Sequence, residues 1–317
     1  MSLPAPFDRR AIPAGAHVGE WRARDGWSIR RFDWPAAGRA RGAILFQGGR
    51  GDIIEKYLEA FDHWRRAGWS VTAFDWRGQG GSGRLTADPQ VGHAESFAPW
   101  IDDLADFYAE WVAATPGPHV VMGHSMGGHL VLRSLAEGRI APDAAVLIAP
   151  MLGLHSFPFT RGIARHVAHL MTRIGKPDRL AWKQNERPAA PSASRRAFLT
   201  HDVDRYDDEM WWKTEKPELA LGPPSWKWVA TAYDSTLALE SPGVLESVRT
   251  PLLIVAAEAD RLVALSAIRR AAARLPDVRL HVYGPESAHE ILREADAVRA
   301  DALTRIDNFL DERAPAL

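Results

Sequence analysis

The sequence of 317 residues contains no cysteine. Without thiols the chain cannot form disulfides, bind a metal through thiolates or use a cysteine nucleophile, so its chemistry depends on oxygen and nitrogen groups. An excess of either charge is also missing, because 39 lysines and arginines balance 40 aspartates and glutamates. A net charge of −1 provides no field for collecting a polyanion, and we predict no nucleic-acid partner.

Long hydrophobic runs are missing as well. No stretch approaches the roughly 20 apolar residues of a membrane span, and residues 1–10 lack the basic start and apolar run of a signal peptide. We therefore expect a cytoplasmic protein. Hydrophobic residues make up 46% of the chain, which is near the globular average, so a full hydrophobic core is available.

Short apolar runs alternate with longer helical patterns up to residue 150 and again from residue 251. The runs predict strands at residues 27–34, 43–47, 70–75, 119–122, 144–149, 252–256 and 278–283. The longer patterns predict helices at residues 53–67, 97–114, 126–137, 265–274 and 295–310. Strands that alternate with helices are typical of a parallel sheet covered by helices, so the sequence predicts an α/β fold.

The alternation stops between residues 151 and 236, where helical fragments rich in arginine, histidine, proline and tryptophan appear without a strand run. Sequence on both sides of this segment is needed to finish one sheet. We therefore predict a core of residues 1–150 and 237–317 that is interrupted by a helical cap at residues 151–236. Five of the 13 tryptophans fall in the cap, and such rings line apolar cavities and lids as well as ordinary cores.

A serine stands between a predicted strand and a predicted helix, in Gly123-His124-Ser125-Met126-Gly127. Glycines two residues before and after it leave room for a strained turn that pushes the serine oxygen out at the end of the sheet. The helix that follows directs its first N–H groups and its positive dipole end at the same place. We predict Ser125 as a nucleophile and the Met126 N–H as a donor to a developing oxyanion.

A serine hydroxyl is a weak nucleophile that needs a base, and the base needs an orienting carboxylate. On a sheet of this kind the acid commonly follows a late strand and the histidine follows the last one. Asp260 comes after the second-last predicted strand, and His289 comes after the last. We predict that Asp260 and His289 join Ser125 in a catalytic triad, with Glu258 as the rival acid.

A second oxyanion donor is expected from the loop after the strand at residues 43–47. This loop contains three glycines within residues 47–51, which lets the backbone approach a substrate closely. We predict the N–H of Gly49 as the donor. A shift of one residue would make Arg50 the donor instead, and the sequence leaves both open.

Together these motifs carry a resemblance that runs nearly end to end. The more specific stretches are Gly49-Arg50-Gly51-Asp52 leading into Glu55-Lys56-Tyr57, Asp75-Trp76-Arg77-Gly78-Gln79-Gly80-Gly81-Ser82, the turn around Ser125, Glu258-Ala259-Asp260-Arg261-Leu262-Val263, and Ala288-His289-Glu290. The chain resembles the α/β-hydrolase superfamily and, within it, the lysophospholipase and monoacylglycerol lipase branch.

The resemblance implies the α/β-hydrolase fold, which is a mostly parallel, eight-stranded sheet flanked by helices, with an inserted helical cap. It also implies that Ser125, Asp260 and His289 form the triad. One departure concerns the oxyanion loop, where the frequent His-Gly of the family is Gln47-Gly48 here. The cap varies too much within the family for a substrate to be transferred.

We therefore predict a serine carboxylic-ester hydrolase that acts on a lipid-like monoacyl ester, namely a lysophospholipid or a monoacylglycerol. The alternatives are a short-chain or xenobiotic carboxylesterase, a C–C bond hydrolase, and a non-enzymatic binding protein on the same scaffold. The sequence leaves the acyl-chain length, the head group, the oligomeric state and the mobility of the cap open.

No cofactor and no metal site are predicted. His166 and His169 share a helical face, but no carboxylate or third histidine completes a metal set nearby in the sequence. Basic residues gather in the same segment, at Arg161, Arg165, His166, Arg173 and Lys176. Such a cluster is usually a solvated face, and its alternative role is transient contact with a lipid surface.

Overall fold

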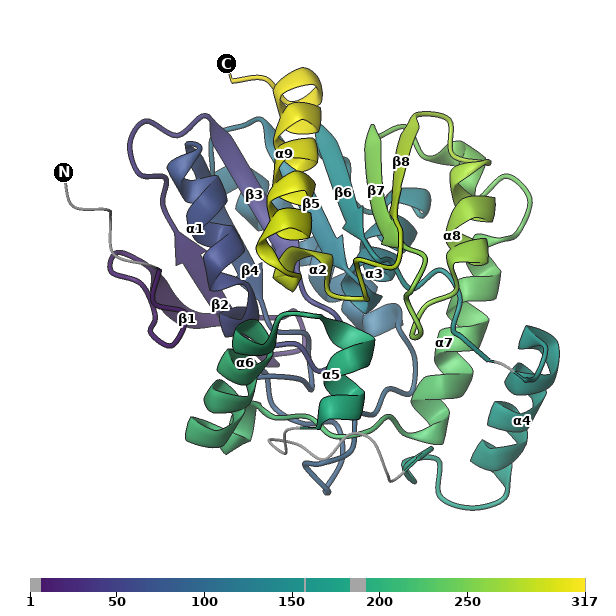
Figure 1. Cartoon of the computed structure of the whole chain (residues 1–317). Coiled ribbons are helices and arrows are strands. Elements are labelled where there is room, and N and C mark those ends of the chain that lie inside the picture. Colours follow the sequence, from purple (N-terminus) through teal and green to yellow (C-terminus); the bar gives the residue numbers. More distant parts are fainter. Residues whose placement is uncertain (1–6, 157, 183–191, 317) are drawn as a thin grey trace.

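The computed structural model describes residues 7–156, 158–182 and 192–316 (Figure 1). Eight strands form one sheet in the order β1-β2-β4-β3-β5-β6-β7-β8. The strands are β1 (His17–Arg22), β2 (Ser28–Trp34), β3 (Gly42–Gln47), β4 (Trp69–Phe74), β5 (His119–His124), β6 (Ala144–Ile148), β7 (Leu252–Ala257) and β8 (Val278–Tyr283). β2 is antiparallel to both β1 and β4, and the other neighbouring pairs are parallel. The predicted mostly parallel, eight-stranded sheet is confirmed.

Helices cover both faces of this sheet (Figure 1). One face carries α1 (Leu58–Arg66) and α9 (Asp296–Arg313), and the other carries α2 (Ala98–Ala114), α3 (Met126–Ala136) and α8 (Leu265–Ala272). The prediction that helices flank the sheet is therefore confirmed.

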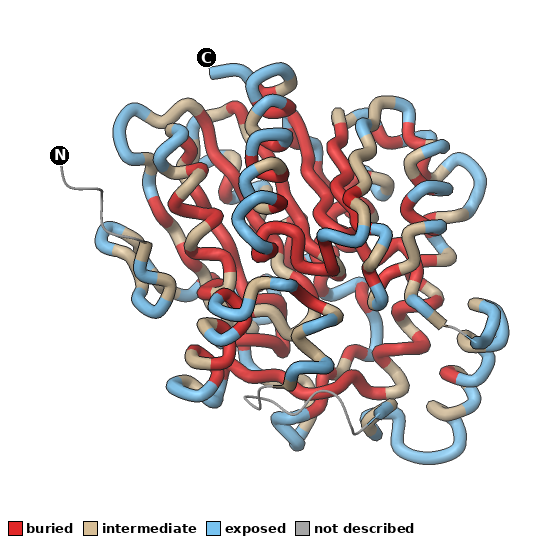
Figure 2. Tube along the Cα trace, in the orientation of Figure 1, coloured by how far each residue is buried: buried red, intermediate tan, exposed pale blue. Residues whose placement is uncertain are grey.

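The middle of the sheet is buried on both sides (Figure 2). Side chains of β5 alternate between two cores, because Val120 and Met122 pack with α1 and α9 whereas Val121 packs with α2 and α3. A strand that is buried on both faces reads as a continuous apolar run, which explains why its sequence signal is clear. The same packing fixes the carboxyl end of β5 and therefore the residue that follows it, Ser125.

One predicted helix starts later than expected. The segment predicted as helical at residues 53–67 begins with the 3₁₀ turn Ile54–Tyr57, and α1 begins only at Leu58. The reason is a hydrogen bond from a distant part of the chain: the Asp75 carboxylate accepts the N–H of Ile54 at 3.1 Å. This contact holds the first turn in a conformation that local helical periodicity does not reveal.

Between β6 and β7 the described residues contain four α-helices. They are α4 (Arg161–Arg173), α5 (Ala193–Leu199), α6 (Val203–Glu215) and α7 (Trp226–Leu239). Figure 1 shows α5 and α6 beyond one end of the sheet and α4 apart from them at the edge of the molecule, where α4 packs against α7. The predicted cap, residues 151–236, ends inside α7. In the described part of the chain, no helix has the length and hydrophobicity needed to cross a membrane.

Candidate active site

Ser125 lies at the sharp turn between β5 and α3. Its backbone angles, φ 52° and ψ −117°, lie outside the regions that residues with a side chain usually adopt. The Ser125 N–H donates to the carbonyl of Ile148 at 2.9 Å, and the Ser125 carbonyl accepts the N–H groups of Met151 (2.9 Å) and His129 (3.1 Å). A strained backbone that its surroundings fix in this way is typical of a functional residue projecting from the end of a sheet.

Glycines on both sides of the serine allow the turn to be this tight. A Cβ atom on Gly127 would lie 2.4 Å from the carbonyl oxygens of Gln47 and Gly48. A Cβ atom on Gly123 would lie 2.6 Å from the nitrogen of Gly128. Both distances are too short for a real Cβ contact, so a larger residue at either position would push β5, α3 and the oxyanion loop apart.

Asp260 and His289 lie in the loops that follow β7 and β8, which are neighbouring parallel strands. The Nδ1 atom of His289 is 2.6 Å from the Oδ2 atom of Asp260. The Oδ1 atom of Asp260 accepts the N–H groups of Leu262 (2.8 Å) and Val263 (3.0 Å). Since both carboxylate oxygens make hydrogen bonds, the carboxylate is fixed in place, and it in turn fixes the orientation of the imidazole ring.

This pair is almost completely buried, with 7% of Asp260 and 3% of His289 exposed. Burial opposes the charged form of each group, but each group stabilises the charged form of the other. The His289 ring and the two backbone N–H groups hold the pKa of Asp260 below its ordinary value. The Asp260 carboxylate raises the pKa of His289 in spite of burial. The geometry therefore suits a histidine base whose imidazolium form is stabilised.

Ser125 and His289 line one cavity of about 410 Å³. Its apolar wall comes from the segment between β6 and β7 and includes Leu154, Trp182, Trp228, Val229 and Tyr233. Among the described residues, Ser125 Oγ makes no hydrogen bond to the His289 ring, and such bonds are often long before a substrate binds. The structure thus brings the predicted nucleophile and the imidazole of the histidine–aspartate pair to one cavity.

The two predicted oxyanion donors border the serine. Met126 begins α3, and the first N–H groups of a helix have no acceptor within that helix. Gly49 is close as well, because a Cβ atom on it would lie 3.0 Å from Ser125 Cβ. The Gly49 N–H already donates to Asp52 Oδ2 at 2.6 Å, so a substrate oxygen would compete with a carboxylate for it. The choice between Gly49 and Arg50 stays a prediction.

The whole chain has relatives among known hydrolases. A family model for serine aminopeptidase, S33, matches residues 38–296. The chain belongs to this hydrolase family. It is 33% identical over 284 residues to lysophospholipase L2 of Escherichia coli K12, a match that covers 84% of this chain and 80% of the relative. It is 28% identical to the probable lysophospholipase L2 of Haemophilus influenzae, which covers 86% of this chain and 84% of that protein.

Solved structures agree with the S33 assignment at the level of the fold. A soluble variant of the monoglyceride lipase from Saccharomyces cerevisiae superposes with a TM-score of 0.77 at 18% identity, over 98% of this chain and 99% of that one. A thermostable carboxyl esterase from Bacillus coagulans gives 0.71 at 16% identity, over 95% and 99%. The predicted α/β-hydrolase fold, the resemblance to the lysophospholipase branch and the prediction of a serine hydrolase are confirmed.

In the wall of the cavity of this S33 hydrolase, Asp52 links the oxyanion loop to Tyr57 and to the end of β5. Its Oδ2 atom accepts the N–H of Gly49 and the hydroxyl of Tyr57 (2.5 Å), and lies 3.1 Å from His124 Nδ1. The other ring nitrogen of His124, Nε2, lies 3.3 Å from the carbonyl oxygen of His289. The residue directly before the nucleophile therefore contacts both the oxyanion loop and the loop of the predicted base.

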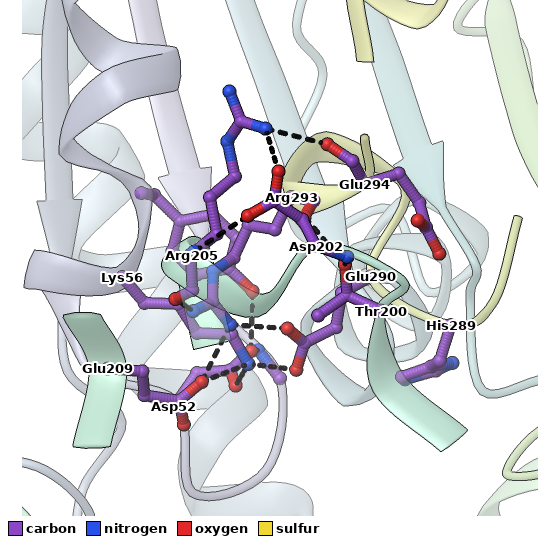
Figure 3. A network of polar contacts seen from close by, with 12 residues as sticks. Asp52, Lys56, Thr200, Asp202, Arg205, Glu209, His289, Glu290, Arg293 and Glu294 are labelled. Carbon is purple, nitrogen blue, oxygen red and sulfur yellow. Dashed lines mark hydrogen bonds and ion pairs between the residues drawn. The ribbon is translucent and has the colours of Figure 1, made fainter. Parts of the chain in front are cut away.

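Asp52 belongs to a buried ionic network (Figure 3). The Lys56 ammonium lies 2.5 Å from both Asp52 Oδ1 and Glu290 Oε1, and 3.6 Å from Glu209 Oε2. Arg293 donates to Glu209 at 2.6 Å and also to Glu290. Glu290 directly follows His289 in the chain, and Glu209 comes from α6. The network thus joins the oxyanion loop, the histidine loop and one helix of the predicted cap.

The neighbours of each buried group in this network favour its charged form. Neighbouring cations hold the pKa values of Glu209 and Glu290 below the ordinary value in spite of burial, and Lys56 does the same for Asp52. The surrounding carboxylates raise the pKa of Lys56 although burial alone would lower it. Each charge is therefore compensated by a neighbour, as a buried ion requires.

Sequence reasoning gives no role to these ionic residues. Lys56 and Glu290 lie within stretches that carry the family resemblance, and this position beside the site motifs is the signal that could have singled them out. Glu209 lies in the predicted cap, in a segment without a motif. Glu209 joins the network only through tertiary contacts with Lys56 and Arg293, which the sequence does not indicate.

Replacing Lys56 with methionine is expected to lower the free energy of unfolding by about 3–5 kcal/mol. Methionine keeps the volume of the side chain but leaves three buried carboxylates, Asp52, Glu209 and Glu290, without the cation at their centre. Urea unfolding followed by circular dichroism measures the change.

The matched control is Lys227→Met. Lys227 pairs with Glu95 at 3.4 Å, but 34% and 69% of these two side chains are exposed. An exposed ion pair of this kind contributes less than about 1 kcal/mol. Equal losses for Lys56→Met and Lys227→Met would contradict a special role for the buried network.

Proposed function

We propose that this protein hydrolyses carboxylic esters through an acyl-enzyme formed on Ser125. The observation that carries the proposal is the convergence of a strained Ser125 and the hydrogen-bonded His289–Asp260 pair on one cavity. Serine, aspartate and histidine in this chain order are the arrangement of α/β-hydrolase triads. Membership of the S33 family supports the same chemistry.

In the first half of the reaction, Ser125 Oγ attacks the ester carbonyl carbon while its proton passes to His289 Nε2. Asp260 stabilises the imidazolium through His289 Nδ1. The tetrahedral intermediate then breaks its bond to the alcohol oxygen, which leaves with the proton from His289. In the second half, His289 takes a proton from water as the water oxygen attacks the acyl-serine carbonyl carbon. The tetrahedral intermediate then breaks its bond to Ser125 Oγ, which regains the proton from His289 as the carboxylic acid leaves.

The oxyanion of each tetrahedral intermediate would accept hydrogen bonds from N–H groups at the turn around Ser125 and in the oxyanion loop. The Met126 N–H at the start of α3 is the first donor, where the helix dipole also favours a negative charge. The second donor is the N–H of Gly49 or Arg50. For Gly49, a developing oxyanion must displace the Asp52 carboxylate from its present hydrogen bond.

For the substrate we propose a lipid-like monoacyl ester. Residues 151–236 give the cavity an apolar part of its wall with three aromatic rings, Trp182, Trp228 and Tyr233, which suits an acyl chain, beside the charged Arg195, Glu209 and Lys213. We propose that this segment acts as a cap over the site. The E. coli relative, at 33% identity, is a lysophospholipase. A small-molecule ester of this class is the partner that we propose for the cavity.

Hydrolysis of p-nitrophenyl esters with acyl chains of two to eighteen carbons tests this proposal, together with a lysophospholipid and a monoacylglycerol. We expect kcat/KM to rise with chain length and both lipids to be cleaved. A steep fall with chain length would indicate a short-chain esterase instead. Hydrolysis of none of these esters would favour a C–C bond hydrolase or a binding protein.

A further inference from the structure

The cavity that contains Ser125 has two chemically different sides. One side is apolar and comes largely from α7, with Trp228, Val229 and Tyr233. The other side is charged and comes from α5, α6 and the loops after β3, β7 and β8, and Figure 1 shows α7 apart from α5 and α6. The charged residues that line this second side are Lys56, Arg195, Glu209, Lys213, Arg261 and Glu290.

The loop of His289 belongs to the charged side. The N–H of Glu290 donates to the carbonyl of Leu199, the last residue of α5, at 2.7 Å. The hydroxyl of Thr200 donates to the carbonyl of Arg293, also at 2.7 Å. These bonds hold the end of α5 directly against the residues that follow the predicted base. By contrast, α7 packs against α3, the helix that begins at the turn around Ser125.

The chemistry of the reaction decides which end of an ester faces which side, and this step rests on the proposed function. His289 must give its proton to the oxygen of the leaving alcohol, so the alcohol part of the ester lies beside His289. The acyl part is attached to the other side of the carbonyl carbon and extends toward α7. The charged side is therefore the place of the alcohol head group.

Two cations on the charged side are suited to bind an anionic head group. Lys213 of α6 is only 7% exposed, and its ammonium contacts Glu209 at 2.6 Å. Arg261 directly follows Asp260 and is exposed, and its guanidinium lies over the ring of Phe198 on α5, 5.5 Å from the ring centroid. Stacking on a ring orients the guanidinium and leaves its N–H groups available at the edge.

The charges on this side leave one cation in excess. The three buried carboxylates of the ionic network are compensated by three cations, Lys56, Lys213 and Arg293. Within the described ranges Arg261 pairs with no carboxylate and adds a positive charge to this balance. A phosphate would supply the missing negative charge and two oxygens that match the fork of an arginine, whereas the hydroxyl groups of glycerol supply no charge.

We propose that the charged side of the cavity is a head-group site that recognises the phosphate of a lysophospholipid. Arg261 donates to the phosphate from the mouth of the cavity, and Lys213 donates from its wall. The two residues determine specificity without taking part in the chemical steps. They favour a lysophospholipid over a monoacylglycerol, whose acyl chain would lie along α7 in the same way but whose alcohol carries no phosphate.

Rates with two esters that differ by one phosphate group test the head-group site. These are 1-acylglycerol 3-phosphate and 1-monoacylglycerol with the same acyl chain, each below the concentration at which it aggregates. We expect the parent to have the higher kcat/KM with the phosphate ester. Arg261→Gln should lower the ratio of the two kcat/KM values by about 10-fold, mainly through KM, because a charged hydrogen bond is lost. Lys213→Gln should lower the same ratio.

The matched control is Arg269→Gln. Arg269 is also exposed, pairs with Glu258 at 3.3 Å and does not line the cavity, so its loss should leave the ratio unchanged. Arg261→Lys keeps the positive charge and should recover part of the preference. An unchanged ratio in both Arg261→Gln and Lys213→Gln would overturn the proposal, as would a parent enzyme that prefers the monoacylglycerol.

Calorimetric titration of Ser125→Ala measures binding of the same two esters without hydrolysis. We expect the phosphate ester to bind more tightly, and Arg261→Gln in this background to reduce the difference. Inorganic phosphate that binds as tightly as the phosphate ester would indicate a site for a free anion and would overturn the head-group site. If the parent cleaves neither ester but the binding preference is present, the proposed function fails and the phosphate site stands. Cleavage of both esters with equal kcat/KM and equal binding gives the opposite result.

Discussion

Replacing Ser125 with alanine is expected to lower kcat for ester hydrolysis by roughly 10⁶-fold. The loss is this large because the members of a triad act as a unit, and without Oγ no acyl-enzyme can form. Hydrolysis of a p-nitrophenyl ester measures the rate, and a fluorophosphonate probe, which reacts with activated serines, reports the nucleophile directly. The parent should be labelled and Ser125→Ala should not.

Ser156→Ala provides the control for this experiment. Ser156 lies in the segment inserted between β6 and β7, and its hydroxyl donates to the carbonyl of Phe159 at 3.1 Å, away from the predicted chemistry. It should keep both the rate and the labelling. Hydrolysis by Ser125→Ala at a rate near that of the parent would remove Ser125 from the mechanism.

Asp260→Asn is expected to lower kcat by about 10⁴-fold. The amide cannot stabilise an imidazolium, and its NH₂ group favours the histidine tautomer that has its hydrogen on the wrong nitrogen. Oδ1 of the asparagine can still accept the N–H groups of Leu262 and Val263, so the loop should keep its structure. Glu258→Gln is the matched control, because Glu258 is exposed and pairs with Arg269 at 3.3 Å. A large loss of kcat in Glu258→Gln with little change in Asp260→Asn would identify Glu258 as the acid of the triad instead of Asp260.

The pH profile gives a second measurement of the same pair. His289 must be neutral to act as a base, so kcat/KM should rise with pH through the pKa of His289. Asp260 raises this pKa, and the acidic limb should therefore lie above the ordinary histidine value of about 6.5. In Asp260→Asn the raising charge is gone while burial remains, so the limb should move to lower pH. An unmoved limb would mean that another group limits the rate.

The sheet could be predicted because its central strands are buried on both faces. β6 and β7 are apolar at every position, and no other strand in the described part of the chain shows this pattern so clearly. The same order indicated where to look for Asp260 and His289, since parallel neighbouring strands bring the loops after them to one edge. The tight turn around Ser125 could be predicted as well, because glycines at positions 123 and 127 indicate a crowded backbone.

Other parts depend on contacts that sequence periodicity does not report. The 3₁₀ turn at Ile54–Tyr57 is held by the carboxylate of Asp75 from a different strand loop. Lys56 meets carboxylates from residues 52, 209 and 290, and no window of the sequence contains all of them. The exposure of apolar side chains on α4, such as Ile163 and Leu170, could not be predicted either. Exposed and buried hydrophobic faces of a helix have the same spacing in the sequence.

The backbone of Ser125 places activity and stability in opposition. A residue with a side chain at φ 52° and ψ −117° costs about 1–3 kcal/mol, whereas glycine adopts these angles without that penalty. The substitution that would relieve this strain is therefore glycine, which has no hydroxyl group. A serine there is consistent with selection for chemistry against the preference of the fold, and attempts to stabilise this protein should leave the turn unaltered.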